Sequence, residues 1–199
     1  MLSVKTRQKY LKNLGFYKGK IDGIEGSITK KAYRNIQKKY FSEIEQDGIY
    51  GKETELLLRN AERVRIYCKH FVLEEFKCEC NGKYCTGYPK LLSINLLEYL
   101  EKIRIKHKKP IYVTSGLRCE IYNNILEGSI KNSKHTKGKA IDFYSSSTNN
   151  LYNRIKIMNY FIKLPYASYS YCDGYMRTKL KKRNISATYM GSSIHIDVL

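Results

Sequence analysis

Residues 133–143, SKHTKGKAIDF, carry the pattern that decides how the C-terminal part of the chain folds. His135 opens a short loop, and Gly138 permits the backbone to reverse sharply within that loop. The apolar run from Ala140 to Phe143 then predicts a strand that contains Asp142. We therefore expect a loop imidazole and a strand carboxylate to converge.

A second histidine lies in SIHIDV, residues 193–198. The alternation predicts a strand that carries His195 and Asp197 on one face and isoleucines on the other. His135, Asp142 and His195 would together supply two imidazoles and one carboxylate, a set that binds Zn²⁺ and leaves the fourth tetrahedral position to water. Such an open site is typical of catalytic zinc, although other divalent metals suit the same ligands.

Helical and strand patterns alternate along the chain from residue 61 onward. The spacing of apolar residues predicts helices over 61–77, 91–107, 120–127 and 152–162, and a strand over 111–114. This mixture predicts an α+β fold with a small antiparallel sheet.

The N-terminal residues contain an internal repeat, because DGIEG at 22–26 recurs as DGIYG at 47–51. Each copy precedes a helical pattern, and its glycines and aspartate are typical of a tight turn that leads into a helix. A further helix is expected over Val4–Leu14. Residues 1–62 are thus predicted to form a three-helix bundle.

This bundle resembles the peptidoglycan-binding domain found at the ends of many bacterial and phage cell-wall hydrolases. The resemblance rests on a G-F-x-x-G-x-x-D-G-x-x-G loop and on three positions in the helix after it. The matching residues are Gly15, Phe16, Gly19, Asp22, Gly23, Gly26, Thr29, Ala32 and Gln37. The resemblance implies that residues 1–62 bind peptidoglycan, while each residue individually could serve only the turns and core of the bundle.

Residues 70–199 resemble the zinc peptidases that cut peptidoglycan peptides, the D-Ala-D-Ala carboxypeptidase and L-alanyl-D-glutamate endopeptidase family, whose zinc fold is shared by the Hedgehog signalling domain. The segments that carry this resemblance are KHFVLEEFKC, VTSGLRC, SKHTKGKAIDF and IHIDV. They imply a zinc peptidase domain over residues 68–199, with His135, Asp142 and His195 as the zinc ligands.

The same resemblance implies substrate contacts for Arg118 and Ser133. Arg118 would face the site, where its permanent charge would hold a substrate carboxylate or stabilise a developing oxyanion. The alternative for Arg118 is a local role, folded back on a nearby aspartate or carbonyl group.

The general base is harder to assign. Many members of this family have an acidic residue three positions before the last ligand, where this chain has Ser192. Asp197 is the best remaining candidate, either as the base or as a partner that orients His195, and a role only in the stability of the fold is the third alternative. Asp173 is a more distant option for the base.

Four cysteines lie near the expected site, three of them in FKCECNGKYC. Cys78, Cys80, Cys85 and Cys119 could bind a structural zinc, form a disulfide after release, or remain unpaired. The C-x-C-x4-C spacing departs from the usual zinc knuckle.

The chain has 199 residues, with 37 Lys and Arg against 18 Asp and Glu, a formal net charge of +19. This charge favours a polyanionic partner, such as an anionic wall polymer, and a nucleic-acid-binding function has no support beyond the charge itself. No apolar segment predicts a membrane span or a signal peptide. We therefore expect synthesis in the cytoplasm and action on the cell wall after release.

Together these features predict an endolysin-like peptidoglycan hydrolase with a wall-binding domain and a zinc peptidase domain. An L-Ala-D-Glu endopeptidase is favoured over a D-Ala-D-Ala carboxypeptidase, because a cut next to the glycan detaches the cross-links. The alternative is a non-catalytic wall-binding protein that retains a structural zinc site.

Overall fold

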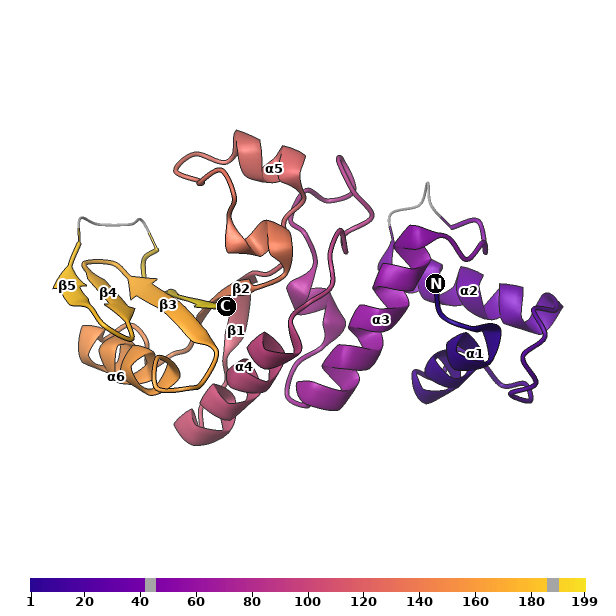
Figure 1. Ribbon diagram of the computed structural model, residues 1–199, viewed down its shortest axis with the longest axis horizontal. Coiled ribbons are helices and arrows are strands. Elements are labelled where there is room, and N and C mark those ends of the chain that lie inside the picture. Colours follow the sequence, from indigo (N-terminus) through magenta and orange to yellow (C-terminus); the bar gives the residue numbers. More distant parts are fainter. Residues whose placement is uncertain (42–45, 186–189) are drawn as a thin grey trace.

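Three helices form the N-terminal part of the computed structural model, which describes residues 1–41, 46–185 and 190–199. They are α1 (Val4–Asn13), α2 (Ser27–Tyr40) and α3 (Lys52–Tyr67), and they lie together at one end of the molecule (Figure 1). The bundle expected from the repeat is thus confirmed.

Each copy of the repeat is held by a buried glutamine. The side-chain amide of Gln8 donates to Asp22 Oδ1 (2.8 Å), and its oxygen accepts from the N–H of Gly23 (2.8 Å). Gln37 makes the equivalent bonds to Asp47 (2.9 Å) and to the glycine after it. Because a glutamine buried without partners would be costly, these bonds fix both loops against the helices.

The helix predicted over 61–77 is wrong in its bounds. Residues 61–67 are the last part of α3, whose helical geometry ends at Cys68 (φ −141°), and only a short 3₁₀ turn, η2 (Leu73–Phe76), follows. The apolar residues Phe71, Leu73 and Phe76 are buried without a continuous helix. The spacing of these three residues resembles a helical pattern, but they reach the core from a largely irregular segment.

The C-terminal part contains one antiparallel sheet of six strands. They are β1 (Tyr112–Ser115), β2 (Ala140–Tyr144), β3 (Ala167–Cys172), β4 (Tyr175–Thr178), β5 (Lys182–Asn184) and β6 (Ile194–Val198), in the spatial order β1-β2-β6-β3-β4-β5. The strands predicted around residues 112, 141 and 195 are confirmed, whereas β3, β4 and β5 were not anticipated.

The two faces of this sheet differ in character. Ile141, Phe143, Ile194 and Ile196 are fully buried on one face, which α4 (Ile94–His107) and α6 (Leu151–Phe161) cover (Figure 1). The opposite face carries polar side chains and lies beneath α5 (Glu120–Ile125) and the 3₁₀ turn η3 (Lys134–Lys137). The candidate site belongs to this polar face.

The two parts share a boundary between α3 and the segment before α4. The Asn60 side chain donates to the carbonyl oxygen of Lys90 and accepts from the N–H of Leu92, both at 2.8 Å. α3 therefore supports the peptidase side of the molecule as well as the bundle. None of the helices in the described ranges combines the length and the apolar character needed to cross a bilayer.

Candidate metal centre

His135 lies in η3 and is held at both its backbone and its ring. Its N–H donates to Ser133 Oγ (3.3 Å), and its Nδ1–H donates to the carbonyl oxygen of Gly116 (2.8 Å). Gly138 ends the turn at φ +68°, where an added Cβ would lie 2.2 Å from the Leu91 oxygen. The ring is thus fixed with Nε2 free to face the site.

Asp142 and His195 face one another across the paired strands β2 and β6. His195 Nδ1 lies 2.7 Å from Asp142 Oδ1, and His135 Nε2 lies 3.4 Å from both Asp142 Oδ2 and His195 Nδ1. All three residues are buried. The convergence predicted from the sequence is confirmed.

The spacing of these three ligand atoms suits a zinc ion. With bonds of about 2.0–2.1 Å to nitrogen or oxygen, neighbouring ligands of a tetrahedron lie about 3.3–3.4 Å apart. His135 Nε2 lies at 3.4 Å from both partners, and the 2.7 Å between His195 Nδ1 and Asp142 Oδ1 is the length of a hydrogen bond, which a bound metal would replace. The donor set and its geometry therefore fit Zn²⁺.

The electrostatics of the group favour the metal-binding protonation states of Asp142 and His135, whereas His195 is favoured in its protonated form. Burial opposes ionisation of Asp142, but hydrogen bonds from the two imidazoles hold the pKa of its carboxyl well below the usual range. Burial lowers the pKa of His135. For His195, burial is outweighed by the two neighbouring carboxylates, which raise its pKa. A metal bound at His195 Nδ1 would displace the proton from that nitrogen.

Asp197 shares the face of β6 with His195, as predicted. Its Oδ2 lies 3.4 Å from His195 Nε2, the ring nitrogen that does not face the metal-ligand group. Its Oδ1 is buried and has no hydrogen-bond partner among the described residues. The carboxylate is thus placed beside the imidazole rather than within the group of three.

Arg118 reaches the same group from the segment after β1. Its Nη2 lies 3.2 Å from Asp142 Oδ2, and its Nε–H donates to Ser115 Oγ (3.1 Å). Arg118 and Ser133 both line a cleft of about 450 Å³ that is also lined by His135 and His195. The guanidinium therefore contacts a local aspartate and borders the cleft at the same time.

Two family models match the chain in agreement with this geometry. The Peptidase M15 model covers residues 69–163, and the putative peptidoglycan binding domain model covers residues 2–58. The chain is a peptidoglycan-binding domain joined to a Peptidase M15 domain. Enzymes of this family are zinc metallopeptidases that act on cell-wall peptides. No curated protein matches the chain significantly.

The match to the M15 family includes His135 and Asp142 but ends before His195. His195 reaches the other two residues through the pairing of β6 with β2. The pairing also explains why Asp142 and His195, which are 53 positions apart, are in contact.

Two tyrosines beside the metal-ligand group were missed from the sequence. Tyr169 and Tyr171 lie on β3, directly opposite Asp197 and His195, and the Tyr171 ring stacks on His195 with 4.5 Å between ring centroids. Burial, together with the Asp142 charge, raises the pKa of Tyr171 to about 12, so the hydroxyl keeps its proton at neutral pH. The alternation in ASYSYC, residues 167–172, was the available signal for this strand.

Asp173 makes its contacts away from the metal-ligand group. Its carboxylate accepts hydrogen bonds from the N–H groups of Met190 (2.7 Å) and Gly191 (2.8 Å), which begin the turn before β6. Ser192 lies in that turn and is partly exposed. Asp173 thus holds the chain segment that leads to His195.

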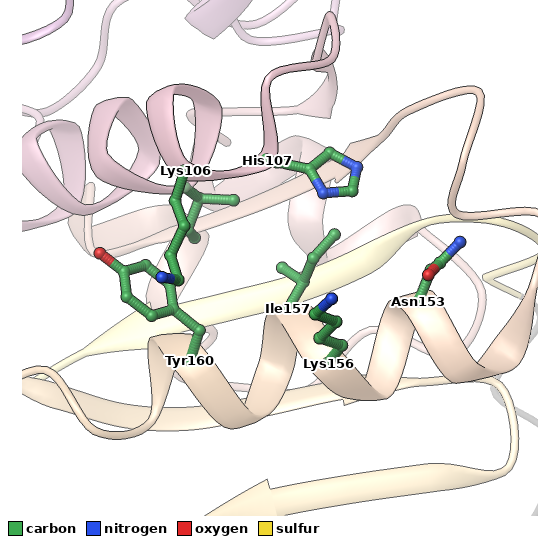
Figure 2. A pocket seen from close by; sticks show the side chains of 7 residues that line it. Lys106, His107, Asn153, Lys156, Ile157 and Tyr160 are labelled. Carbon is green, nitrogen blue, oxygen red and sulfur yellow. The ribbon is translucent and has the colours of Figure 1, made fainter.

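A second pocket of about 280 Å³ lies between α4 and α6 of the M15 domain. Figure 2 shows Lys106 and His107 from α4 facing Lys156 and Tyr160 from α6, with the Lys106 Nζ 5.1 Å from the centre of the Tyr160 ring. Burial and the surrounding positive charges lower the pKa of His107. This basic pocket is separate from the cleft at the metal-ligand group.

Proposed function

We propose that the protein hydrolyses an amide bond of the peptidoglycan stem peptide, with the L-Ala-D-Glu bond as the preferred target and D-Ala-D-Ala carboxypeptidase activity as the next candidate. The observation that carries this proposal is the buried group of His135, Asp142 and His195 at a cleft large enough for a peptide. A wall-binding domain in the same chain favours the endopeptidase, because a cut close to the glycan detaches the cross-links.

His135 would bind the metal through Nε2, His195 through Nδ1, and Asp142 through its carboxylate. Zinc bound there would lower the pKa of a water ligand to about 7 and polarise the carbonyl group of the scissile bond. Gly116 would hold His135 in the tautomer that ligation requires, through the hydrogen bond to its Nδ1.

Asp197 has a proposed role as the partner that orients His195. Its carboxylate accepts the Nε2–H of the ring and so favours the tautomer in which Nδ1 is free for the metal. The general-base alternative for Asp197 is weaker, because the carboxylate faces the ring nitrogen that lies away from the other ligands.

Arg118 and Tyr171 have proposed roles toward the substrate. Arg118 is held by Asp142 and Ser115 and borders the cleft, so it presents a fixed positive charge to an acidic group such as the D-Glu carboxylate. Tyr171 borders the same cleft and keeps its hydroxyl proton, which it can donate to a peptide oxygen. Ser133 lines the cleft as well, and its proposed substrate contact is secondary to its hydrogen bond with His135.

We further propose that the enzyme acts as an endolysin does, at the bacterial wall after release from the cell that makes it. The net charge of +19 favours contact with anionic wall polymers. The pocket that contains Lys106 and Lys156 is one place where such a polymer would find concentrated positive charge (Figure 2).

The test is to incubate zinc-loaded protein with purified sacculi, with and without a chelator, and to identify new peptide termini by mass spectrometry. New N-terminal D-Glu that is lost with chelator and restored by zinc supports the endopeptidase, while released D-Ala identifies the carboxypeptidase. Sacculi that bind the protein but remain uncut, with zinc present, would replace this proposal with the non-catalytic wall-binding alternative, which Ser192 at the usual acidic position favours.

A further inference from the structure

Four cysteine sulfurs gather on the M15 domain at a place distinct from the His135 group. Cys78, Cys80 and Cys85 come from the loop after η2, and Cys119 precedes α5. Each offers one sulfur, and the four sulfurs lie within 4.8 Å of one another. Three of the four residues are buried, and Cys85 is partly buried.

The distances suit a metal better than a disulfide. The sulfurs of Cys80 and Cys85 are 3.5 Å apart, whereas a disulfide requires about 2.05 Å. In a tetrahedral site with zinc–sulfur bonds of about 2.3 Å, neighbouring sulfurs lie about 3.8 Å apart. A group of four within 4.8 Å therefore needs only a small contraction to surround one ion.

Backbone N–H groups already point at these sulfurs. The N–H of Cys119 donates to Cys78 Sγ (3.3 Å), that of Gly87 donates to Cys85 Sγ (3.4 Å), and that of Tyr122 donates to Cys119 Sγ (3.4 Å). Thiolate ligands are commonly surrounded by such donors, which offset their negative charge and fix their orientation.

The loop that contains three of these cysteines has no regular secondary structure of its own. Residues 77–93 form no helix or strand. The cysteines form a small buried cluster of their own with Tyr84 and Tyr122, separate from the main hydrophobic core. Burial of a few thiols stabilises a loop of this length weakly, whereas a metal bound by four residues supplies folding free energy directly.

We propose that Cys78, Cys80, Cys85 and Cys119 bind a second zinc ion as a structural site with four thiolate ligands. Four protein ligands leave no position for water, which is the property of a structural rather than a catalytic zinc. Thiolates select zinc over the hard cations that prefer oxygen ligands.

The position of this site connects it to the catalytic cleft. The N–H of Leu117 donates to the Phe76 oxygen (3.0 Å), and a Cβ on Gly116 would lie 2.6 Å from the Phe76 Cα. A metal bound by both Cys78 and Cys119 would hold the segment after Phe76 against the segment 116–119. Segment 116–119 supplies Arg118 and the Gly116 carbonyl oxygen that accepts from His135. The second zinc therefore positions residues of the catalytic cleft, and this role in hydrolysis rests on the proposed function.

The test is to measure the zinc content of the full-length protein by elemental mass spectrometry and by native mass spectrometry of the intact chain. We expect two zinc ions per chain in the wild type, and one in both His135→Ala/His195→Ala and Cys80→Ser/Cys85→Ser. Cys172→Ser is the control, because Cys172 is also a buried free cysteine but lies outside the cluster, and it should keep both ions.

Cobalt substitution identifies the ligands independently of activity. The His135→Ala/His195→Ala variant loaded with Co²⁺ should show the intense near-ultraviolet charge-transfer band of thiolate ligands. This variant keeps every cysteine, so the result does not depend on whether cysteine variants fold.

Two results would overturn the proposal. One is a His135→Ala/His195→Ala variant without bound metal, in which the four thiols react freely with a thiol reagent; the other is a disulfide within the cluster, detected by a mass two hydrogens lower. Absence of hydrolysis by the wild-type protein, with the thiolate band intact in the His135→Ala/His195→Ala variant, would instead count against the proposed function alone.

Discussion

The substitution Asp197→Asn distinguishes two roles that the sequence leaves open for this residue. Asp197 is either the general base or the partner that orients His195. Asp197 is 6% exposed, and its Oδ2 lies 3.4 Å from His195 Nε2. A hydrogen bond to a charged group contributes about 1.5–3 kcal/mol, and the long distance places this one at the lower limit. Asparagine keeps an acceptor oxygen but loses the charge, so about 1.4 kcal/mol, or tenfold in zinc affinity, is the expected loss.

The assay has two readouts. Competition with a chromophoric chelator gives the zinc affinity, and turnover of soluble muropeptides at saturating zinc gives kcat. We expect the affinity to fall about tenfold while kcat changes much less than the 10²–10⁴-fold typical of a lost general base. Asp197→Ala, which leaves the ring N–H without a partner, should lose more affinity than Asp197→Asn. Unchanged zinc affinity together with a kcat loss of about 100-fold or more would refute the orienting role and assign Asp197 as the base.

Three further predictions concern stability. Gly138→Ala should destabilise the protein by at least about 2 kcal/mol and lower its zinc content, because the residue has positive φ and a Cβ would meet a backbone oxygen at 2.2 Å; normal thermal unfolding would contradict this. Asn60→Ala should cost about 2–4 kcal/mol in urea unfolding, because it leaves two backbone groups of residues 90–92 unpaired, and a change under about 0.5 kcal/mol would show that water replaces the amide. Burial opposes ionisation of Glu62, but hydrogen bonds from Arg65 and Asn13 lower the pKa of its carboxyl below 4.5. The folded state then binds fewer protons, so the stabilisation is present above pH 4.5 and is lost as the pH falls through the folded-state pKa. Glu62→Gln should therefore unfold more easily at neutral pH, with a difference that vanishes in acid, and a pH-independent difference would contradict the charge-based explanation.

Local patterns determined much of the fold. The repeated D-G-x-x-G turns predicted helix starts close to those of α2 and α3, and IHIDV placed isoleucines on one face of β6 and His195 and Asp197 on the other. These features depend on backbone preferences and on a period of two or 3.6 residues, so a few neighbouring residues are enough to specify them.

The prediction for residues 61–77 was wrong because apolar spacing alone does not distinguish a helix from an irregular segment that packs into the core. The strand β3 was missed for a related reason. Its tyrosines and serines alternate, but hydrophobicity differs little between them, and the position of Tyr171 beside His195 comes only from pairing with β6.

The sequence by itself determined which residues of this protein are candidate zinc ligands, because His135, Asp142 and His195 are recognisable by type and by motif. Only the tertiary structure decided that His195 directs Nδ1 to the group and Nε2 to Asp197, that Arg118 contacts Asp142, and that Cys119 joins three cysteines of a distant loop. The physical reason is that strand register is set by the packing of Ile194 and Ile196 against the helices on the far face of the sheet. Contacts between residues far apart in sequence therefore depend on the assembled core, which no short stretch of the chain encodes.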